Sequence, residues 1–199
     1  VLAGGVTDSV FTDNRTDYGG TALNIGGLDG GIHRSHFTGN IGSGDGGGAI
    51  FARGMMNGGI IDSTFTGNQA QSGGAIYAAV GFGADAISKS EFTGNRAVGS
   101  GMYCGIGGAI DLFNGTMTLH NSTFSGNSAT NAGGSIWSDN AEVILTTDNA
   151  GTMLFSGNVA NGAANSIHFR NGGNLVVDTE AGSTVQMEDA FSAYVAANG

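Results

Sequence analysis

The sequence predicts an all-β protein, a right-handed parallel β-helix of about six to seven coils with three short strands per coil. Three observations predict this fold. A Phe-x-x-Asn phrase recurs along the chain, a Gly-Gly-Ala-Ile phrase alternates with it, and no segment has the 3.6-residue periodicity of an amphipathic helix. A repeat of roughly 27 residues is too short to bury its own apolar face, so neighbouring repeats must cover one another.

The first phrase occurs six times, and its phenylalanines are 26 to 32 residues apart. The copies occupy residues 11–14, 37–40, 65–68, 92–95, 124–127 and 155–158. The second phrase follows each copy, at residues 19–23, 47–50, 73–76, 107–110 and 133–136, and in a decayed form at 163–167. The strict alternation of the two phrases indicates one coil for each pair of phrases.

An aliphatic residue stands five positions before the repeated phenylalanine, as Val6, Ile32, Ile60, Ile87 and Leu119. On one flat strand this offset would place the two apolar residues on opposite faces, so we expect the chain to turn between them. The three predicted strands hold the aliphatic residue, the Ser-x-Phe stretch and the Ala-Ile stretch, with glycine-rich turns between them. Each strand pairs with its copies at ~4.8 Å, which gives a rod ~30 Å long.

The residues in and around the first phrase have structural roles in the predicted coil. Phenylalanine and the serine two residues before it point inward, and the phenylalanines stack along the axis. The asparagine bonds backbone amides of its turn and the asparagine of the next coil, as in an amide ladder. The following threonine points outward, and glycine allows the corner. A residue type repeated six times is therefore expected to be structural, because an active site is singular.

Composition excludes several classes of function. The net charge is −10 with a single lysine, Lys89, so a basic patch for nucleic acid cannot form. Cys104 is the only cysteine and excludes an intrachain disulfide. No apolar run approaches the ~18 residues of a membrane-spanning helix. The first residues lack the pattern of a signal peptide, so we expect any export signal to lie outside this sequence.

The alternating Phe-x-x-Asn and Gly-Gly-Ala-Ile phrases resemble those of the chlamydial polymorphic membrane proteins, over residues 6–169. The resemblance implies a secreted passenger domain displayed at the cell surface. It further implies an adhesin or a structural surface protein, held at the outer membrane through a region outside this sequence. The partner of an adhesin would be a protein or glycan on a host or neighbouring cell, whereas a purely structural stalk would have no loop or patch for contact. Residues 171–199 depart from the pattern, and we expect them to continue or cap the β-helix body of residues 1–170.

The alternative is a β-helical enzyme that degrades polysaccharide, a lyase or glycosidase. Such an enzyme needs two carboxylates facing one groove, whereas Asp62, Asp85, Asp111 and Asp139 are expected in different parts of different coils. Asp45 stands alone in a glycine-rich corner, and the histidines lack metal-ligand spacing. We therefore expect no catalysis, no metal and no cofactor.

The candidate ligand-binding residues lie where the repeat is broken or faces outward. Residues 96–106 contain an insertion that must leave the coil as a loop, and its Met102 and Tyr103 could contact a partner. A second long loop is expected between Trp137 and Phe155. The residue after each repeat isoleucine should face outward, which gives the column Asn24, Phe51, Tyr77, Asp111, Trp137 and His168. We expect Phe51, Tyr77 and Trp137 either to form an adhesive face or to pack beneath a loop.

Overall fold

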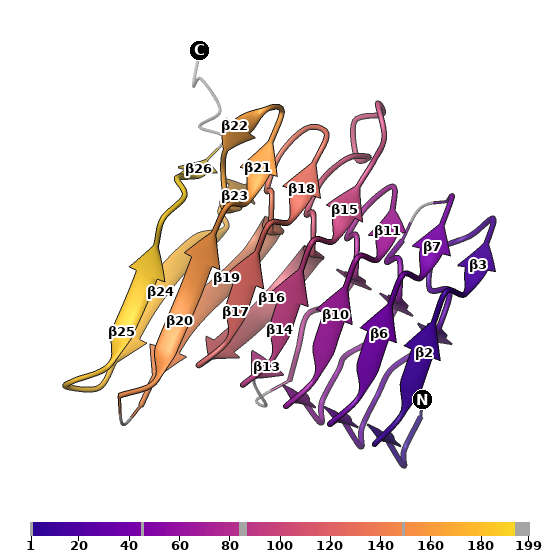
Figure 1. Cartoon of the computed structure of the whole chain (residues 1–199), viewed down its shortest axis with the longest axis horizontal. Coiled ribbons are helices and arrows are strands. Elements are labelled where there is room, and N and C mark those ends of the chain that lie inside the picture. Colours follow the sequence, from indigo (N-terminus) through magenta and orange to yellow (C-terminus); the bar gives the residue numbers. More distant parts are fainter. Residues whose placement is uncertain (1, 45, 84–86, 149, 194–199) are drawn as a thin grey trace.

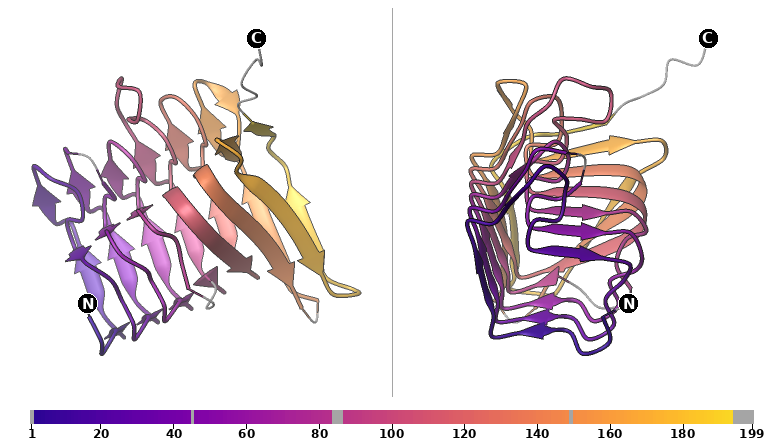
Figure 2. Two further views of the ribbon diagram at one scale, coloured as in Figure 1. Left: turned by 180° about the vertical axis from the view of Figure 1, so that it is seen from behind. Right: turned by 90° about the vertical axis from the view of Figure 1, so that its right-hand side faces the viewer.

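The protein is a rod of stacked coils, and the first and last coils lie at opposite ends of it (Figure 1). This computed structural model describes residues 2–44, 46–83, 87–148 and 150–193. Within these residues it contains strands and no helix. Three sheets wrap around one core, as the view along the rod shows (Figure 2, right), and the predicted β-helix is thereby confirmed.

The phenylalanine strands form a seven-stranded sheet in which every pairing is parallel. Its strands follow one another along the chain, one from each coil: β2 (Val10–Thr12), β6 (His36–Thr38), β10 (Thr64–Thr66), β14 (Glu91–Thr93), β17 (Thr123–Ser125), β20 (Thr152–Ser156) and β25 (Thr184–Met187). The phenylalanines pair in register, Phe65 between Phe37 and Phe92, so equivalent residues of successive coils lie directly above one another.

A second seven-stranded sheet begins directly after the repeated asparagine. Its two-residue strands are β3 (Arg15–Thr16), β7 (Ile41–Gly42), β11 (Gln69–Ala70), β15 (Arg96–Ala97), β18 (Ser128–Ala129), β21 (Val159–Ala160) and β22 (Ala163–Ala164). The last pairing, of β21 with β22, is antiparallel. The sequence pattern does not predict this sheet, because strands of two residues are too short to show alternation.

The aliphatic strands and the Ala-Ile strands, expected as two separate layers, belong to one 12-stranded sheet. In the first coils they are separate short strands: β1 (Val6–Thr7), β5 (Ile32–His33), β9 (Ile60–Ile61) and β13 (Ile87–Ser88), and β4 (Leu23–Ile25), β8 (Ile50–Ala52) and β12 (Ile76–Ala78). In the next two coils each pair fuses into one long strand, β16 (Ile110–His120) and β19 (Ile136–Thr147).

The long strand β19 corrects the expectation of a long loop between Trp137 and Phe155. Residues 142–147 alternate between half-buried and buried, as a strand with one face on the core requires. In the earlier coils the equivalent segments are rich in glycine and interrupt the strand, and they pair from coil to coil through single bridges such as Leu28 with Met56. The long strands lie side by side on the back of the rod (Figure 2, left).

Residues 171–193 add a further coil to the stack. After β23 (Ile167–Arg170), which pairs with β19, the chain forms β24 (Asn174–Thr179), β25 and β26 (Phe191–Ala193). These three strands pair in parallel with β19, β20 and β23 respectively. The irregular sequence of this region therefore continues the sheets that the repeats begin.

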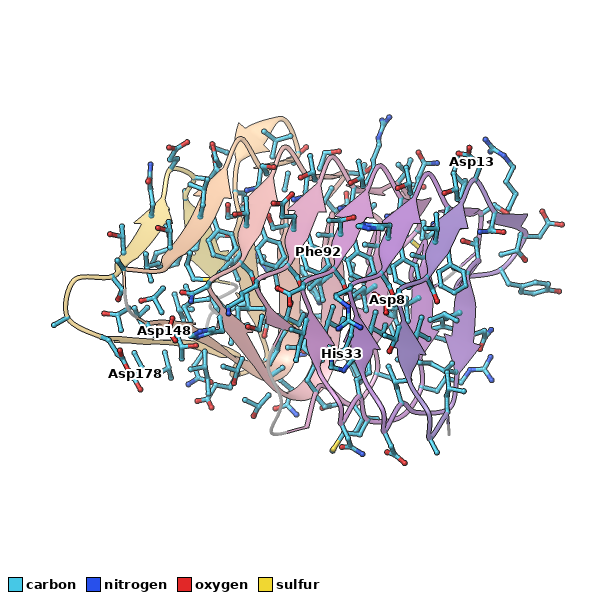
Figure 3. The ribbon with its side chains drawn as sticks, turned by 60° about the horizontal axis from the view of Figure 1, so that its bottom comes forward. Asp8, Asp13, His33, Phe92, Asp148 and Asp178 are labelled. Atoms are coloured by element: carbon cyan, nitrogen blue, oxygen red, sulfur yellow. The ribbon has the colours of Figure 1, made fainter. Side chains whose placement is uncertain are left out.

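The interior is a column of phenylalanine rings beside rows of aliphatic side chains. Phe37, Phe65, Phe92, Phe124 and Phe155 are fully buried. Their centroids are 4.7 to 5.0 Å apart, and the ring planes differ by 7° or less. Figure 3 shows the ring of Phe92 in line with the rings of the neighbouring strands. Burial of one such ring contributes about 1.5–3 kcal/mol, and its contacts with two neighbours add to this.

The asparagines form a hydrogen-bonded ladder beside the rings. Nδ2 of Asn68 donates to Oδ1 of Asn95 over 3.0 Å and to the carbonyl oxygen of Phe37 over 2.9 Å. Its backbone nitrogen donates to the same Oδ1 over 3.0 Å. The pattern repeats from Asn14 to Asn158, and the predicted ladder is confirmed. The backbone partners lie in the neighbouring coils, however, and not in the turn of the same asparagine.

The ladder ends on a carboxylate. Asn158 donates from its backbone nitrogen and from Nδ2 to Oδ2 of Asp189, over 2.8 and 2.9 Å. Ser166 donates its hydroxyl to the same oxygen over 3.0 Å, and Gly157 donates to Oδ1 over 3.1 Å. An ionised carboxylate only accepts hydrogen bonds, so it suits the end of a ladder in which each member donates toward the next coil.

The turn expected between the aliphatic residue and the phenylalanine is present in the five coils that have this aliphatic residue. It is made by one residue in the left-handed region, which is Asp8, Arg34, Asp62, Lys89 or Asn121, with φ between 42° and 50°. The chain therefore changes direction within three residues, and both apolar residues of the offset pair reach the core. The serine before the phenylalanine is buried as predicted, and its hydroxyl receives the backbone N–H of the preceding coil, as Ser63 does from Ser35 over 3.1 Å.

Candidate functional site

The outward face of the 12-stranded sheet contains one column of large side chains. The sheet register places Phe51 beside Tyr77, Tyr77 beside Asp111, Asp111 beside Trp137, and Trp137 beside His168. These five residues each follow the repeat isoleucine, which points into the core. Alternation along the strands therefore forces them outward, as the sequence predicted.

The inserted loop of residues 98–105 closes over this column and forms a pocket of about 540 Å³. The pocket is lined by Phe51, Tyr77, Met102, Tyr103 and Trp137, together with Gly46, Ser72, Cys104, Ile106, Asp111 and Phe113. The loop and the outward column, which the sequence presents as two independent candidates, thus form one site. All five candidate residues line it.

The side chains are exposed to different degrees. Met102 and Tyr103 are 78% and 53% exposed, whereas Phe51 and Tyr77 are half-buried and Trp137 is only 7% exposed. The indole of Trp137 stacks on the imidazole of His168 at a centroid distance of 4.6 Å. The column is therefore not an open stripe along the rod. It is the wall of a pocket, with the loop across it.

Several contacts fix the loop on the coil. The carbonyl of Tyr103 accepts a hydrogen bond from the buried hydroxyl of Ser72. The carbonyl of Cys104 accepts from Nδ2 of Asn131 over 2.7 Å, and its thiol donates to Oε1 of Gln71 over 3.2 Å. The guanidinium of Arg170 lies 5.2 Å from the centre of the Tyr103 ring. These contacts to three coils hold the loop against the sheet.

Asp111 is a buried carboxyl group on the floor of the pocket. It is 3% exposed, and desolvation raises its pKa well above the ordinary value, with a further rise from the charge of Asp139. Asp139 is also buried, but it accepts a hydrogen bond from Nδ2 of Asn171 over 2.7 Å and lies 3.7 Å from Nη1 of Arg170. Burial, and secondly the charge of Arg170, lowers the pKa of His168.

The interaction of Asp111 with Asp139 corrects the expectation that these acids are far apart. Asp111 is in register with Trp137, and Asp139 follows Trp137 by two residues on the same face. Alternation along β19 was the signal that could have found this pair. Asp139 does not line the pocket, and among the described residues Asp111 is the carboxyl group in its wall. Such a pocket, with aromatic walls and an acid, is suited to binding a ligand.

The remaining candidates do not form a site. Among the described residues, no three His, Cys, Asp or Glu side chains are grouped so as to hold a metal ion. No helix able to cross a membrane was found within the same part of the chain. Asp45 and Asp85 lie outside the described residues. Asp62 is exposed at its corner, away from the pocket.

A family model described as the Chlamydia polymorphic membrane protein repeat matches residues 62–79 and 121–139. Each stretch contains one complete Phe-x-x-Asn phrase and the Gly-Gly-Ala-Ile or Gly-Gly-Ser-Ile phrase that follows it. In the structure each stretch runs from the corner before the phenylalanine strand to the outward column. Neither the curated proteins nor the solved structures gave a match to the chain.

Proposed function

We propose that this chain, whose repeats are of the chlamydial polymorphic membrane protein type, is a surface-displayed β-helical adhesin that binds its partner at the pocket under residues 98–105. The partner is a component of a host or neighbouring cell surface. The family model supports an association with a bacterial outer membrane. The rod then acts as a rigid body that holds the pocket.

One observation carries this proposal: the largest departure from the repeat, the inserted loop, lies over the outward aromatic column and encloses a pocket with it. A purely structural rod gains nothing from such a loop. The pocket is lined mainly by aromatic and apolar side chains with few polar groups, which is the usual composition of a ligand site. Exposed Met102 and Tyr103 at its rim extend the contact area toward a larger partner.

Binding of the labelled protein to epithelial cells tests the proposal. Tyr103→Ala and Met102→Ala remove rim side chains without touching the coil core, and we expect each to weaken binding about tenfold, because aromatic anchors contribute about 1–2 kcal/mol or more. Tyr77→Ala combined with Trp137→Ala should abolish it. Tyr18→Ala, which removes a side chain that is 76% exposed and outside the pocket, is the matched control.

Circular dichroism and thermal melting verify that each variant is folded, since Trp137 is itself buried. The rim variants remain informative if the double variant loses stability. Equal binding by the wild-type protein, the rim variants and the Tyr18→Ala control would contradict the proposal.

The rival function is hydrolysis or lysis of a polysaccharide, favoured by the two interacting carboxyl groups. A glycosidase uses one protonated and one ionised carboxyl group. Burial raises the pKa of Asp111, and the carboxylate of Asp139 lies 3.7 Å from Nη1 of Arg170. In the non-catalytic proposal only Asp111 meets the ligand. Release of reducing ends from polysaccharides, lost in Asp139→Asn, would favour the enzyme.

A further inference from the structure

We propose that the pocket binds a quaternary ammonium head group of the choline type, placed between Tyr77, Tyr103 and Trp137 and neutralised by the carboxylate of Asp111. This inference rests on the proposed function, because it names the ligand of the same pocket. It follows from the shape of the column, from the character of its rings and from the charge on its floor.

The shape comes from one small residue in a column of large ones. Tyr77, Asp111 and Trp137 occupy the same position in three successive coils. Coils that are ~4.8 Å apart place the two aromatic residues ~9.6 Å from one another, with only a carboxyl group between them. The outer atoms of a bound group lie ~3.5–4.0 Å from each ring. The gap therefore suits a group whose outermost atoms on its two sides are ~2 Å apart. A tetrahedral head group has that thickness, whereas a flat ring does not.

The rings of this pocket already interact with cations. The guanidinium of Arg53 lies 5.0 Å from the centre of Phe51, and that of Arg170 lies 5.2 Å from the centre of Tyr103. Both rings line the pocket. The negative face of an aromatic ring attracts a cation, and the attraction is strongest where water is excluded. Tyr77 and Trp137 flank the space between these two contacts.

The floor of the pocket is an acid without a cation. In the part of the chain that the structure describes, the ion pairs are Arg34 with Asp8, His120 with Asp148 and Arg170 with Asp139, and none includes Asp111. Arg170 lies on the neighbouring strand 3.7 Å from the carboxylate of Asp139, whereas burial raises the pKa of Asp111. A bound ammonium group would supply the opposite charge that Asp111 lacks.

A sugar ring fits this pocket less well. It presents a hydroxyl group on most of its carbons, and each buried hydroxyl requires a polar partner. Apart from Asp111, the described lining residues with polar side-chain groups are Ser72, Cys104, two tyrosines and Trp137, whose indole has one N–H donor. The hydroxyl of Ser72 and the thiol of Cys104 already donate to Tyr103 and Gln71.

The two ligand classes predict opposite pH dependences. Desolvation raises the pKa of Asp111, so the empty pocket holds a protonated acid over a wide pH range below that pKa. An ammonium ligand favours the ionised form, and its binding must release a proton. Affinity should therefore rise by up to tenfold for each pH unit below the raised pKa and level off above it. A neutral ligand that uses the protonated acid would bind more weakly as pH rises.

Among the described residues, the other ionisable groups around the pocket are Tyr77 on β12, Asp139 on β19, His168 and Arg170 on β23, Arg53 directly after β8, and Tyr103 and Cys104 in the loop. Protonation of His168 at low pH would also oppose a cation. The Asp111→Asn variant isolates the contribution of Asp111, because it preserves the shape of the neutral acid and leaves the other groups in place.

Isothermal titration calorimetry with choline tests the inference. We expect the wild-type protein to bind choline with release of up to one proton, measured in buffers of different ionisation enthalpy, and to bind the neutral isostere with carbon in place of nitrogen at least tenfold more weakly. Asp111→Asn should lose at least tenfold in affinity together with the pH dependence. Tyr18→Ala should bind as the wild type does.

Vesicles distinguish the sources of the head group. Binding to phosphatidylcholine vesicles but not to phosphatidylglycerol vesicles would identify a lipid head group, and binding of choline alone would identify a free ligand; both support the inference. Equal affinity for choline and its neutral isostere overturns it. So does a lack of choline binding by a protein whose attachment to cells still depends on Tyr103 and Met102, and in that case the proposed function stands. Cell attachment that is unchanged by the substitutions in the pocket contradicts the proposed function instead.

Discussion

A single asparagine of the ladder has four hydrogen-bonding tasks. Asn95 donates from Nδ2 to Asn127 and to the carbonyl of Phe65, and its Oδ1 accepts from the backbone and the side chain of Asn68. It is fully buried, so water cannot replace a partner that is lost. An amide, with a donor and an acceptor on one planar group, is the side chain that can do all of this.

The substitution Asn95→Asp tests the ladder at this scale. A carboxylate keeps the bonds from Asn68 but turns two attractive contacts into repulsions, and we expect a loss of about 3–5 kcal/mol in the free energy of unfolding. Asn14→Asp makes the same change at the exposed end of the ladder and should cost below about 1 kcal/mol. Urea unfolding followed by circular dichroism measures both. Equal losses in the two variants would refute the account.

Sequence predicted the inward and outward residues because repetition fixes them. Phe92 and Asn95 recur in six coils, so their role is read from alignment of the copies with one another. Asp111 occurs once in its column, and its significance depends on neighbours from other strands and from a loop. The burial that raises its pKa is a property of the assembled pocket and has no signature in the local sequence.

The glycine pairs set how closely two sheets approach. A Cβ atom on Gly74 would lie 2.1 Å from the carbonyl oxygen of Gly108 and 2.5 Å from the backbone nitrogen of Arg96. Both are backbone atoms, in the turn before β16 and in β15, and both residues are hydrogen-bonded to a neighbouring coil, so they cannot move aside. Gly94 differs, because its φ is +63° and a Cβ there would meet nothing within 4 Å. The first glycine is required by space, and the second by backbone conformation.

Alanine substitutions separate these two causes. Gly74→Ala should destabilise the protein by about 3 kcal/mol or more, because it forces backbone apart in a packed region. Gly94→Ala should cost about 1–2 kcal/mol, the price of the left-handed conformation for an ordinary residue. Gly94→Asn should recover part of that loss, since asparagine tolerates this conformation, whereas Gly74→Asn should not. Melting temperatures that fail to separate the two positions would contradict the distinction.

The sequence predicted the strands whose apolar and polar residues alternate. It missed the strands and contacts that leave no such alternating pattern. The two-residue strands after the asparagine carry no pattern of their own and are fixed only by pairing with their copies. The fusion into β16 and β19 depends on the absence of glycine-rich bends in two coils. The fold of the inserted loop back onto the column follows from side-chain contacts to residues such as Ser72 and Asn131.

Each coil of the rod is stabilised by its contacts with the neighbouring coils. The closing group of the asparagine ladder is the carboxylate of Asp189. Stability in such proteins is approximately the sum of each coil and its contacts with the adjacent coils. Asp189 gives the final acceptors to Asn158, Gly157 and Ser166. The sequence of residues 171–199 suggested a continuation or a cap; in the described part, up to residue 193, strands pair with those of the preceding coil and Asp189 accepts from Asn158.

Removal of this closing group should have a local effect. We expect Asp189→Ala to cost about 2–4 kcal/mol, because buried donors lose their acceptor. Amide hydrogen exchange should accelerate in β20, β21 and β25, with little change in β2, β6 and β10, since contacts extend only to adjacent coils. Asp178→Ala, at an exposed position of β24, is the control and should leave exchange unchanged. Uniform acceleration along the rod would show a single cooperative unit instead.

The amide ladder has a direction, so the two ends of the rod are chemically different. Every asparagine from Asn14 to Asn127 donates its backbone hydrogen and one Nδ2 hydrogen to the asparagine of the following coil. The row of asparagines therefore begins with an acceptor at Asn14 and ends with donors at Asn158. A coil joined in the reverse orientation would place the hydrogen-bond donors of the ladder against other donors. Duplication of a coil within the row preserves the match at both junctions, so the rod can lengthen by copying its own repeats and still close on the same aspartate.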